Sequence, residues 1–159
     1  MRINIFRLLV SISLSMTAGI LGSFFTVASI PTWYAFLNKP FFSPPNFVFG
    51  PVWTILYTLI GISFYRIWMK ENRNKTKKKN AFILFFIHLL FNTTWSIVFF
   101  GFQQIFWGLL NILILWALIV AVIMTFYKID KKASLILIPY LLWVTFATIL
   151  NTSIWLLNP

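Results

Sequence analysis

The chain has 159 residues, of which 60% are hydrophobic and 9% are charged, and its formal net charge is +11. This composition, with the charges confined to a few short stretches, excludes a soluble protein and predicts an all-α integral membrane protein. The sequence contains no cysteine, which excludes disulfide bonds, thiol catalysis and iron–sulfur clusters.

Uncharged stretches set the predicted membrane spans, because about 20 apolar residues cross a bilayer as a helix. Residues 8–30, 41–65 and 133–159 exceed that length, and the uncharged stretch 80–127 must fold back once, at Gly101-Phe102-Gln103-Gln104. We therefore expect residues 1–159 to form a single domain, a five-transmembrane-helix bundle with spans at about 8–29, 46–68, 80–100, 104–127 and 133–156.

Basic residues gather on alternate connections of this bundle. Twelve of the thirteen lysines and arginines precede the first span or lie in the second and fourth connections, and Lys39 alone lies opposite. The positive-inside rule then places the N-terminus in the cytoplasm and the C-terminus outside. We expect the protein to lie in the cytoplasmic membrane. The basic run 70–79 is interpreted as the signal that fixes the orientation of the helices in the membrane, and anionic lipid is a candidate contact for it. It does not indicate nucleic-acid binding. The apolar run after Arg7 is too long for the core of a signal peptide, so we expect a retained helix.

The first span carries a face of small residues, namely Ser15, Ala18, Gly19, Gly22 and Ser23. Small residues at this spacing allow helices to approach closely in a membrane. We expect this face to pack within the bundle, and a dimer interface is the alternative.

The segment that enters the second span is rich in proline and aromatic residues. Because prolines interrupt a helix, Pro44, Pro45 and Pro51 belong at its entrance or against protein neighbours. We interpret this segment as an aromatic-lined lid over the interior of the bundle.

Four of the five spans pair an aromatic residue with a small or polar residue on one face, at spacings of three, four or seven. These faces are Trp53, Tyr57 and Gly61; His88, Asn92, Trp95 and Phe99; Trp107 and Asn111; and Trp143, Ala147 and Asn151. Flat apolar walls with a few polar groups predict a pocket for a large planar ligand.

Ordinary packing of the bundle, together with belts of aromatic residues at the two membrane surfaces, is the alternative interpretation of these aromatics. The belt would take in the aromatic residues near the span ends, which are Trp33, Tyr34, Trp68, Tyr127 and Trp155.

Residues for acid–base or metal chemistry are scarce. The two acidic residues, Glu71 and Asp130, both lie in basic connections, so the sequence offers no catalytic carboxylate pair, metal site or proton relay within the spans. The single histidine, His88, is either hydrogen-bonded inside the bundle or an axial ligand of haem. Hydrolysis and ion-coupled transport are therefore not supported.

Three blocks of sequence, in order, resemble the translocator protein family, whose members are also called tryptophan-rich sensory proteins or peripheral-type benzodiazepine receptors. They are Trp33-Tyr34-x-x-Leu37-x-Lys39-Pro40 with Pro44-Pro45 and Phe49-Gly50-Pro51-Val52-Trp53-Thr54-x-Leu56-Tyr57; Asn92-x-x-Trp95-Ser96-x-x-Phe99-Phe100-Gly101; and Pro139-Tyr140-x-x-Trp143-x-x-Phe146-Ala147-x-x-Leu150-Asn151 with Ile154-Trp155.

The resemblance implies a homodimer of five-helix bundles, each with a pocket beneath the first loop. It implies porphyrins such as protoporphyrin IX, haem or other hydrophobic planar molecules as ligands, with no required cofactor. The implied ligand-binding residues are Tyr34, Trp53, Tyr57, Asn92, Trp95, Trp143, Ala147 and Asn151, with Pro44 and Pro45 shaping the lid. The animal sterol motif, a Tyr followed by Arg or Lys near the end of the fifth helix, is absent, which argues against strong sterol binding.

Three ligand-related functions remain open at this point, beside a purely structural or partner-regulating role. The first is a membrane receptor for porphyrin-like ligands, in tetrapyrrole handling or stress sensing, with Lys39 near the outer mouth. The second is passive transport of such ligands. The third is light-dependent porphyrin breakdown, in which the resemblance implicates Trp53 and Trp143.

Overall fold

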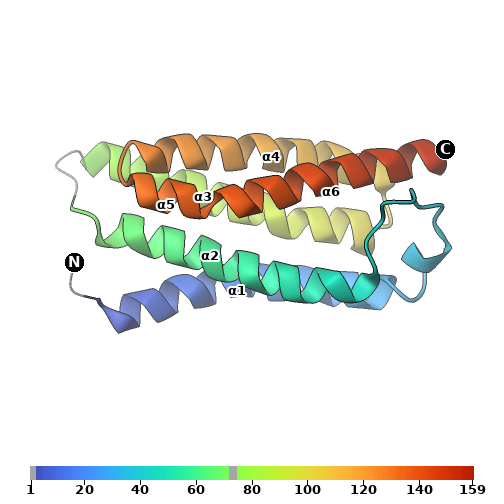
Figure 1. Ribbon diagram of the computed structural model, residues 1–159, viewed down its shortest axis with the longest axis horizontal. Coiled ribbons are helices and arrows are strands. Elements are labelled where there is room, and N and C mark those ends of the chain that lie inside the picture. Colours follow the sequence, from blue (N-terminus) through green and yellow to red (C-terminus); the bar gives the residue numbers. More distant parts are fainter. Residues whose placement is uncertain (1–2, 72–74) are drawn as a thin grey trace.

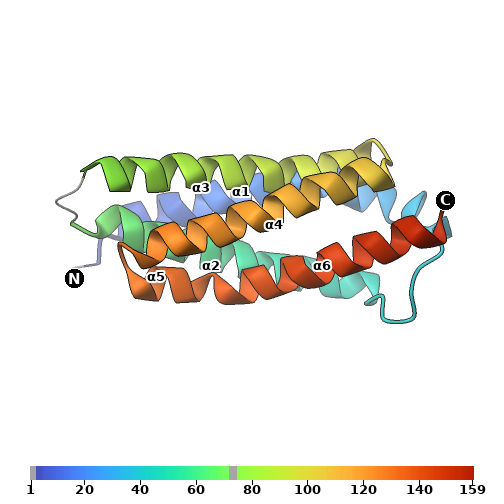
Figure 2. The same cartoon turned by 90° about the horizontal axis from the view of Figure 1, so that it is seen from above.

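The computed structural model describes residues 3–71 and 75–159, so the predicted topology charges at Arg2 and Arg73 lie outside the described residues. The chain folds into an elongated helical bundle (Figures 1 and 2). Its elements are α1 (Ile5–Ser29), η1 (Tyr34–Phe36), η2 (Asn46–Val48), α2 (Phe49–Met69), α3 (Lys75–Ser96), η3 (Ile97–Gly101), α4 (Ile105–Tyr127), α5 (Lys131–Ile136) and α6 (Ile138–Leu157).

Five helical segments within the described residues are long and apolar enough to cross a membrane, which confirms the predicted bundle. They are Ile5–Ser29, Asn46–Met69, Lys75–Gly101, Ile105–Tyr127 and Lys131–Leu157. The C-terminus and the connection between α1 and α2 lie at one end, and the end of α2 and the start of α3 lie at the other (Figure 1). We call these the loop end and the basic end.

The helices extend beyond the uncharged stretches that predicted them. The first helix begins at Ile5 because the side chain of Asn4 accepts a hydrogen bond from the backbone N–H of Arg7 and caps it. The third helix includes the lysines from Lys75 onward, since lysine is a good helix former. Capping and helix propensity, rather than charge alone, therefore set these boundaries.

The predicted reversal at Gly101–Gln104 is confirmed. The chain leaves η3, a π-helical segment, through Gln103, whose φ is 57°. The backbone N–H of Phe102 donates to Ile97 O at 2.8 Å, and that of Gln104 donates to Val98 O at 3.1 Å. These bonds close the end of the third span before α4 begins.

The fifth span is two helices rather than the single helix that was predicted. The break lies at Leu137, where α5 ends and α6 begins. Pro139 lies two residues further on, and its missing N–H and its ring prevent a continuous helical ladder. The N–H of Leu137 bonds to Ser134 O at 3.1 Å instead, which turns the chain between the two helices.

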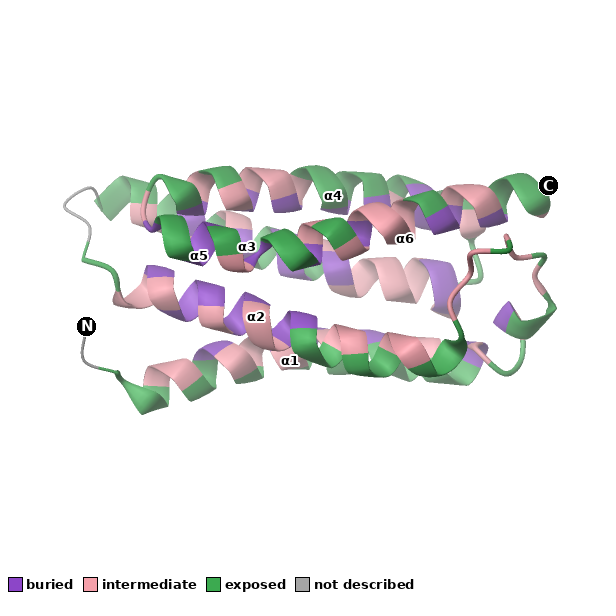
Figure 3. Cartoon of the chain, viewed as in Figure 1, coloured by how far each residue is buried: buried purple, intermediate pink, exposed green. Residues whose placement is uncertain are grey.

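Most of the small-residue face of α1 packs within the bundle, as predicted: Ser15, Ala18 and Gly22 are buried, whereas Ser23 is exposed. Ser11 and Ser15 are fully buried. A Cβ built on Gly61 of α2 would lie 2.6 Å from Ile12 Cα, so the two helices touch through their backbones. Figure 3 shows the buried residues of the helices turned toward the interior of the bundle.

An ion pair joins α2 to the connection between α4 and α5 at the basic end. Arg66 Nη2 lies 2.8 Å from Asp130 Oδ2. The other carboxylate oxygen of Asp130 accepts from the backbone N–H groups of Lys132 and Ala133, at 2.8 and 3.2 Å, and caps α5. Burial opposes ionisation of Asp130, but these hydrogen bonds and the guanidinium lower its pKa below the ordinary value.

The connection between α1 and α2 is fastened to the end of α6. The N–H of Asn38 donates to Asn158 Oδ1 at 3.0 Å, and Asn158 Nδ2 donates to Asn38 O at 2.9 Å. Lys39 Nζ donates to the carbonyl of Tyr34 at 2.8 Å and lies 4.8 Å from the centre of that ring. Its ammonium is thus engaged by the loop itself.

Candidate ligand-binding cavity

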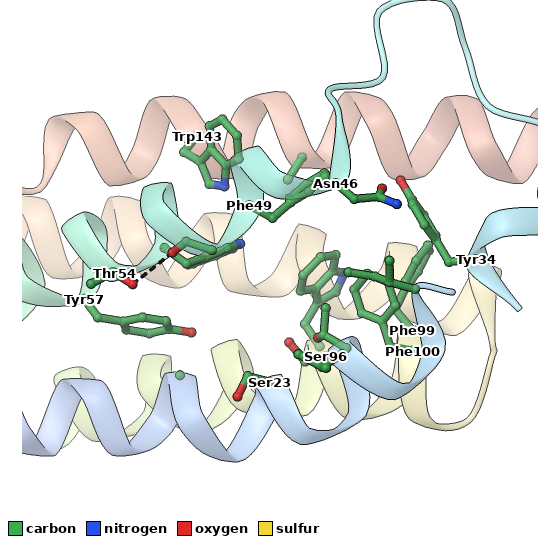
Figure 4. Close-up of a pocket in the computed structure, with 18 of the residues that line it drawn as sticks. Ser23, Tyr34, Asn46, Phe49, Thr54, Tyr57, Ser96, Phe99, Phe100 and Trp143 are labelled. Atoms are coloured by element: carbon green, nitrogen blue, oxygen red, sulfur yellow. Dashed lines mark hydrogen bonds between the residues drawn. The ribbon is translucent and has the colours of Figure 1, made fainter. Parts of the chain in front are cut away.

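A cavity of about 450 Å³ lies at the loop end, between α1, α2, the α3–η3 segment and α6 (Figure 4). This volume falls within the range of about 300–1,000 Å³ that is usual for small-molecule sites. Its lining consists of Met16, Gly19, Ile20, Ser23, Thr26 and Val27 of α1 with Ile30 just after it; Tyr34, Asn46, Phe47, Phe49, Gly50, Trp53, Thr54 and Tyr57; Trp95, Ser96, Phe99 and Phe100; and Trp143, Ala147, Leu150, Asn151 and Ile154.

Three tryptophans from three different helices form much of the wall. Trp53 of α2 stacks on Tyr57, one turn along, with ring centroids 5.4 Å apart and planes at 28°. Trp95 of α3 stacks on Phe99 at 5.7 Å and 21°. Trp143 of α6 meets Phe49 edge to face at 6.1 Å. These contacts fix the rings before any ligand enters, which lowers the entropic cost of binding.

The π-helical segment η3 brings two consecutive rings to the same cavity. Neighbours in an α-helix point about 100° apart, but the wider π turn shifts the helical register. Phe99 and Phe100 are both buried and both line the cavity, with their centroids 4.8 Å apart. Figure 4 shows the two rings together beside Ser96.

Asn151 supplies an amide at the wall, and this amide also holds the site together. Its Oδ1 accepts from Trp95 Nε1 at 3.3 Å, and its Nδ2 donates to the carbonyl of Ile105 at 3.2 Å. The bond to Trp95 orients that indole, and the bond to Ile105 ties α6 to the start of α4. Asn151 thus keeps only part of its hydrogen-bonding capacity for a ligand.

Asn92 lies outside this lining, beyond the Tyr57 ring. Its Oδ1 accepts from the Tyr57 hydroxyl, and its Nδ2 donates to the Tyr140 hydroxyl at 2.9 Å. Asn92 and Tyr140 are 2% and 1% exposed. In the structure Asn92 therefore orients a residue of the wall and does not face the cavity itself.

Most of the predicted site residues come together in this lining. They are Tyr34, Trp53, Tyr57, Trp95, Trp143, Ala147 and Asn151. Tyr34 is only 3% exposed, so its alternative assignment to an interfacial belt is wrong. Burial raises the pKa of the Tyr34 hydroxyl, and a hydrogen bond from the Ser43 side chain offsets part of this rise. Tyr34 therefore stays neutral. Pro44 and Pro45 lie in the loop but not in the lining.

The aromatic face predicted on the fourth span points elsewhere. Trp107 is 60% exposed, and Asn111 donates to Thr94 Oγ1 of α3 at 3.0 Å. No residue of α4 belongs to the lining formed by the described residues.

The side of the cavity formed by α1 was not predicted. Its residues Met16, Ile20, Ser23, Val27 and Ile30 follow each other at spacings of three and four, which is the signal that could have revealed them. Gly19 and Ser23 on this side belong to the small-residue face of α1, which was predicted as a packing surface only. Ile20, Val27 and Phe47 are exposed, so the cavity opens between α1 and the start of α2 toward the lipid side of the bundle.

His88 is buried among aromatic side chains of the bundle. It is 1% exposed and packs 5.1 Å from Phe85 and 5.9 Å from Tyr140, measured between ring centroids. Its Nδ1 lies 2.6 Å from the carbonyl oxygen of Phe85; a carbonyl only accepts, so Nδ1 carries the proton. His88 does not line the cavity, and the residues described contain no group of three or more His, Asp or Glu that could hold a metal ion.

The fold and the cavity together define an integral membrane protein of five spans, with an aromatic-walled cavity at one end. The model of the TspO/MBR family matches residues 11–156, so the chain belongs to this family. The tryptophan-rich protein TspO of Archaeoglobus fulgidus is 48% identical over 157 residues, covering 98% of this chain and 99% of that protein.

More distant relatives carry other names. The human translocator protein is 34% identical, over 84% of this chain and 79% of its own length. The tryptophan-rich sensory protein of Cereibacter sphaeroides is 35% identical, over 79% of this chain and 77% of its own length.

Proposed function

We propose that the protein is a membrane receptor that binds porphyrin-like and other planar apolar molecules in this cavity, in tetrapyrrole handling or stress sensing. The observation that carries the proposal is the wall of three tryptophans, Trp53, Trp95 and Trp143, around a space of about 450 Å³. Flat rings favour a flat partner, because offset stacking adds about 0.5–1.5 kcal/mol per pair beyond burial.

The opening between α1 and α2 supports an apolar ligand. A molecule dissolved in the bilayer can reach the cavity from the side without crossing the loop. The polar groups of the lining, among them Ser23, Ser96 and Asn46, are few and scattered, so they orient a ligand more than they attract charge. Because Lys39 is already bonded to loop carbonyls, acidic groups of a porphyrin would have to displace those bonds to reach it.

A titration of purified protein with protoporphyrin IX in the dark tests this proposal. Porphyrin absorbance is the readout, because removing indoles changes tryptophan fluorescence by itself. We expect saturable binding by the wild type and roughly 30-fold weaker binding by Trp53→Ala/Trp143→Ala, since two stacking partners are lost.

The matched control is Trp107→Ala/Trp155→Ala, which removes two partly exposed indoles outside the cavity lining. It should bind like the wild type. Binding that does not saturate, or that falls equally in both double variants, would mean that porphyrin only partitions into detergent.

Light-dependent breakdown of bound porphyrin is a second candidate, favoured by the position of Trp53 and Trp143 in the wall. An indole in contact with an excited macrocycle can exchange an electron with it without any metal or acid–base pair, and dioxygen from air is the oxidant that the breakdown consumes. Under illumination in air, we expect saturable loss of porphyrin absorbance and one defined product in the wild type. Trp53→Phe and Trp143→Phe should abolish that product; its survival in both would exclude this chemistry.

Passive transport through the bundle is less well supported. The half toward the basic end is filled by side chains, with Phe64 stacked on Phe85 at 4.2 Å and Ile60 and Phe126 fully buried. A ligand in the cavity has no open path through this packing. Uptake of porphyrin into proteoliposomes that is faster than leakage through protein-free vesicles would favour transport. Such transport includes shuttling of the ligand along the surface of a homodimer. The homodimer itself remains a prediction.

A further inference from the structure

A second hollow lies at the opposite end of the molecule from the ligand cavity. It is a groove of about 530 Å³ between the end of α2 and the start of α3. Its lining is Trp68 of α2 with Lys75, Lys78, Lys79, Phe82, Ile83 and Phe86 of α3. We call this the basic-end groove.

The groove changes from charged to apolar along the axis of α3. Lys75, Lys79, Phe82 and Phe86 follow at steps of four, three and four residues, so they lie on one helical face. The two lysines are exposed at the end of the span, and the aromatic rings continue the same face into the span. Phe86 is 47% exposed and Ile83 is 48% exposed, so their apolar surfaces are open to the surroundings of the bundle.

Contacts between α2 and α3 hold the groove in shape. Lys78 Nζ donates to the carbonyls of Trp68 at 2.7 Å and Lys70 at 2.9 Å, and so caps the end of α2 from α3. The Trp68 ring packs against Phe64 at 6.2 Å and lies under the guanidinium of Arg7, at 5.2 Å from its carbon to the ring centroid. The far wall is therefore fixed without a ligand.

The charge of this region is unbalanced. The chain has only two acidic residues, and one of them, Asp130, is already paired with Arg66. The other, Glu71, acts electrostatically on Lys78. A phosphate placed between Lys75 and Lys79 would meet an excess of positive charge. A molecule that fits must therefore carry an anion at one end and an apolar chain at the other.

We propose that the basic-end groove binds one anionic phospholipid, with its phosphate between Lys75 and Lys79 and an acyl chain along Phe82 and Phe86. A lipid fits better than an acidic peptide or a nucleic acid, because the apolar part of the groove lies within a membrane span and continues in line with the lysines. This site is independent of the porphyrin proposal, because it lies at the other end of the bundle.

Native mass spectrometry of the full chain in a neutral detergent tests the site. The protein is incubated with equimolar phosphatidylglycerol and phosphatidylcholine of identical acyl chains, and the lipid retained on each protein is identified. We expect the first retained lipid to be phosphatidylglycerol. In Lys75→Gln/Lys79→Gln that preference should fall about tenfold or more, because each lysine near a membrane surface contributes appreciably to anionic lipid binding.

The matched control is Lys131→Gln/Lys132→Gln, which removes two exposed lysines from the start of α5. It should keep the preference. An equal loss in both variants would overturn the proposed site, because general attraction by the positive surface would then explain the lipid preference. Glycerophosphoglycerol, the headgroup without acyl chains, should compete poorly; competition as strong as that of the lipid would also overturn the proposal, because the apolar groove would then be unused.

Discussion

Asn92 is the residue whose position in the structure most changes its expected role. Its amide joins the hydroxyls of Tyr57 and Tyr140 in one buried chain of hydrogen bonds. The helical period correctly placed Asn92 on the face of Trp95, but a face does not specify depth along the bundle. At this depth the Tyr57 ring separates the amide from the cavity, so Asn92 acts on a ligand through the orientation of Tyr57.

Replacing Asn92 with leucine should therefore lower the stability of the protein directly and the affinity for a ligand only indirectly, through Tyr57. The change removes the hydrogen-bond partner of the buried hydroxyls of Tyr57 and Tyr140, which we expect to lower the free energy of unfolding by about 1–2 kcal/mol. Thermal unfolding in detergent measures this. The control is Asn80→Leu, on the exposed part of the same helix.

Removing the hydroxyls as well should reverse much of that loss. In Asn92→Leu/Tyr57→Phe/Tyr140→Phe no polar group is left unpaired, and replacing both partners of a buried bond with apolar groups is nearly neutral. A triple variant less stable than Asn92→Leu would show that the chain of hydrogen bonds does not explain the effect.

Among the elements, the contact of α1 with α2 sets how the cavity is shaped, because both helices line it. The two backbones approach closely where Gly61 meets Ile12. Backbone cannot rotate away as a side chain can, so Gly61→Ala must push the helices apart. We expect a loss of about 1–3 kcal/mol in the free energy of unfolding.

Gly50→Ala is the matched control for this change. It lies in the first turn of α2, where a Cβ would meet nothing within 4 Å. We expect it to be neutral or slightly stabilising, because alanine is a better helix former than glycine by about 1 kcal/mol. Equal melting temperatures for the two variants would argue against a close backbone contact at Gly61.

The helices around the cavity show why some residues of the site could be predicted from the sequence and others could not. Trp53, Trp95 and Trp143 could be predicted, because each sits in regular α-helix at a spacing of three or four from another chosen residue. Phe100 could not, because an α-helical period directs it away from Phe99 and only the π turn of η3 brings it back. The break at Leu137 was signalled by Pro139 but lay inside an unbroken apolar stretch.

At the scale of the whole molecule, the two ends of the bundle differ in how firmly they are closed. The loop end encloses the cavity and opens between α1 and α2. At the basic end the Arg66–Asp130 pair ties α2 to the α4–α5 connection, and Ser63 Oγ donates to Ala133 O at 2.7 Å beside it. We infer that the basic end acts as the fixed base from which the helices lining the cavity diverge.

The pH dependence of stability tests that role for Asp130. Its folded-state pKa is lowered below 3.8, so the unfolded chain takes up the proton first. The stabilisation is therefore complete above that ordinary value and is lost as pH falls through the folded-state pKa. We expect the melting temperature of the wild type to decline below about pH 4, whereas Asp130→Asn should be about 2 kcal/mol less stable at pH 7 and nearly insensitive to acid. Glu71→Gln, which alters an exposed carboxylate, should follow the wild-type profile; an acid decline that persists in Asp130→Asn would place the responsible group elsewhere.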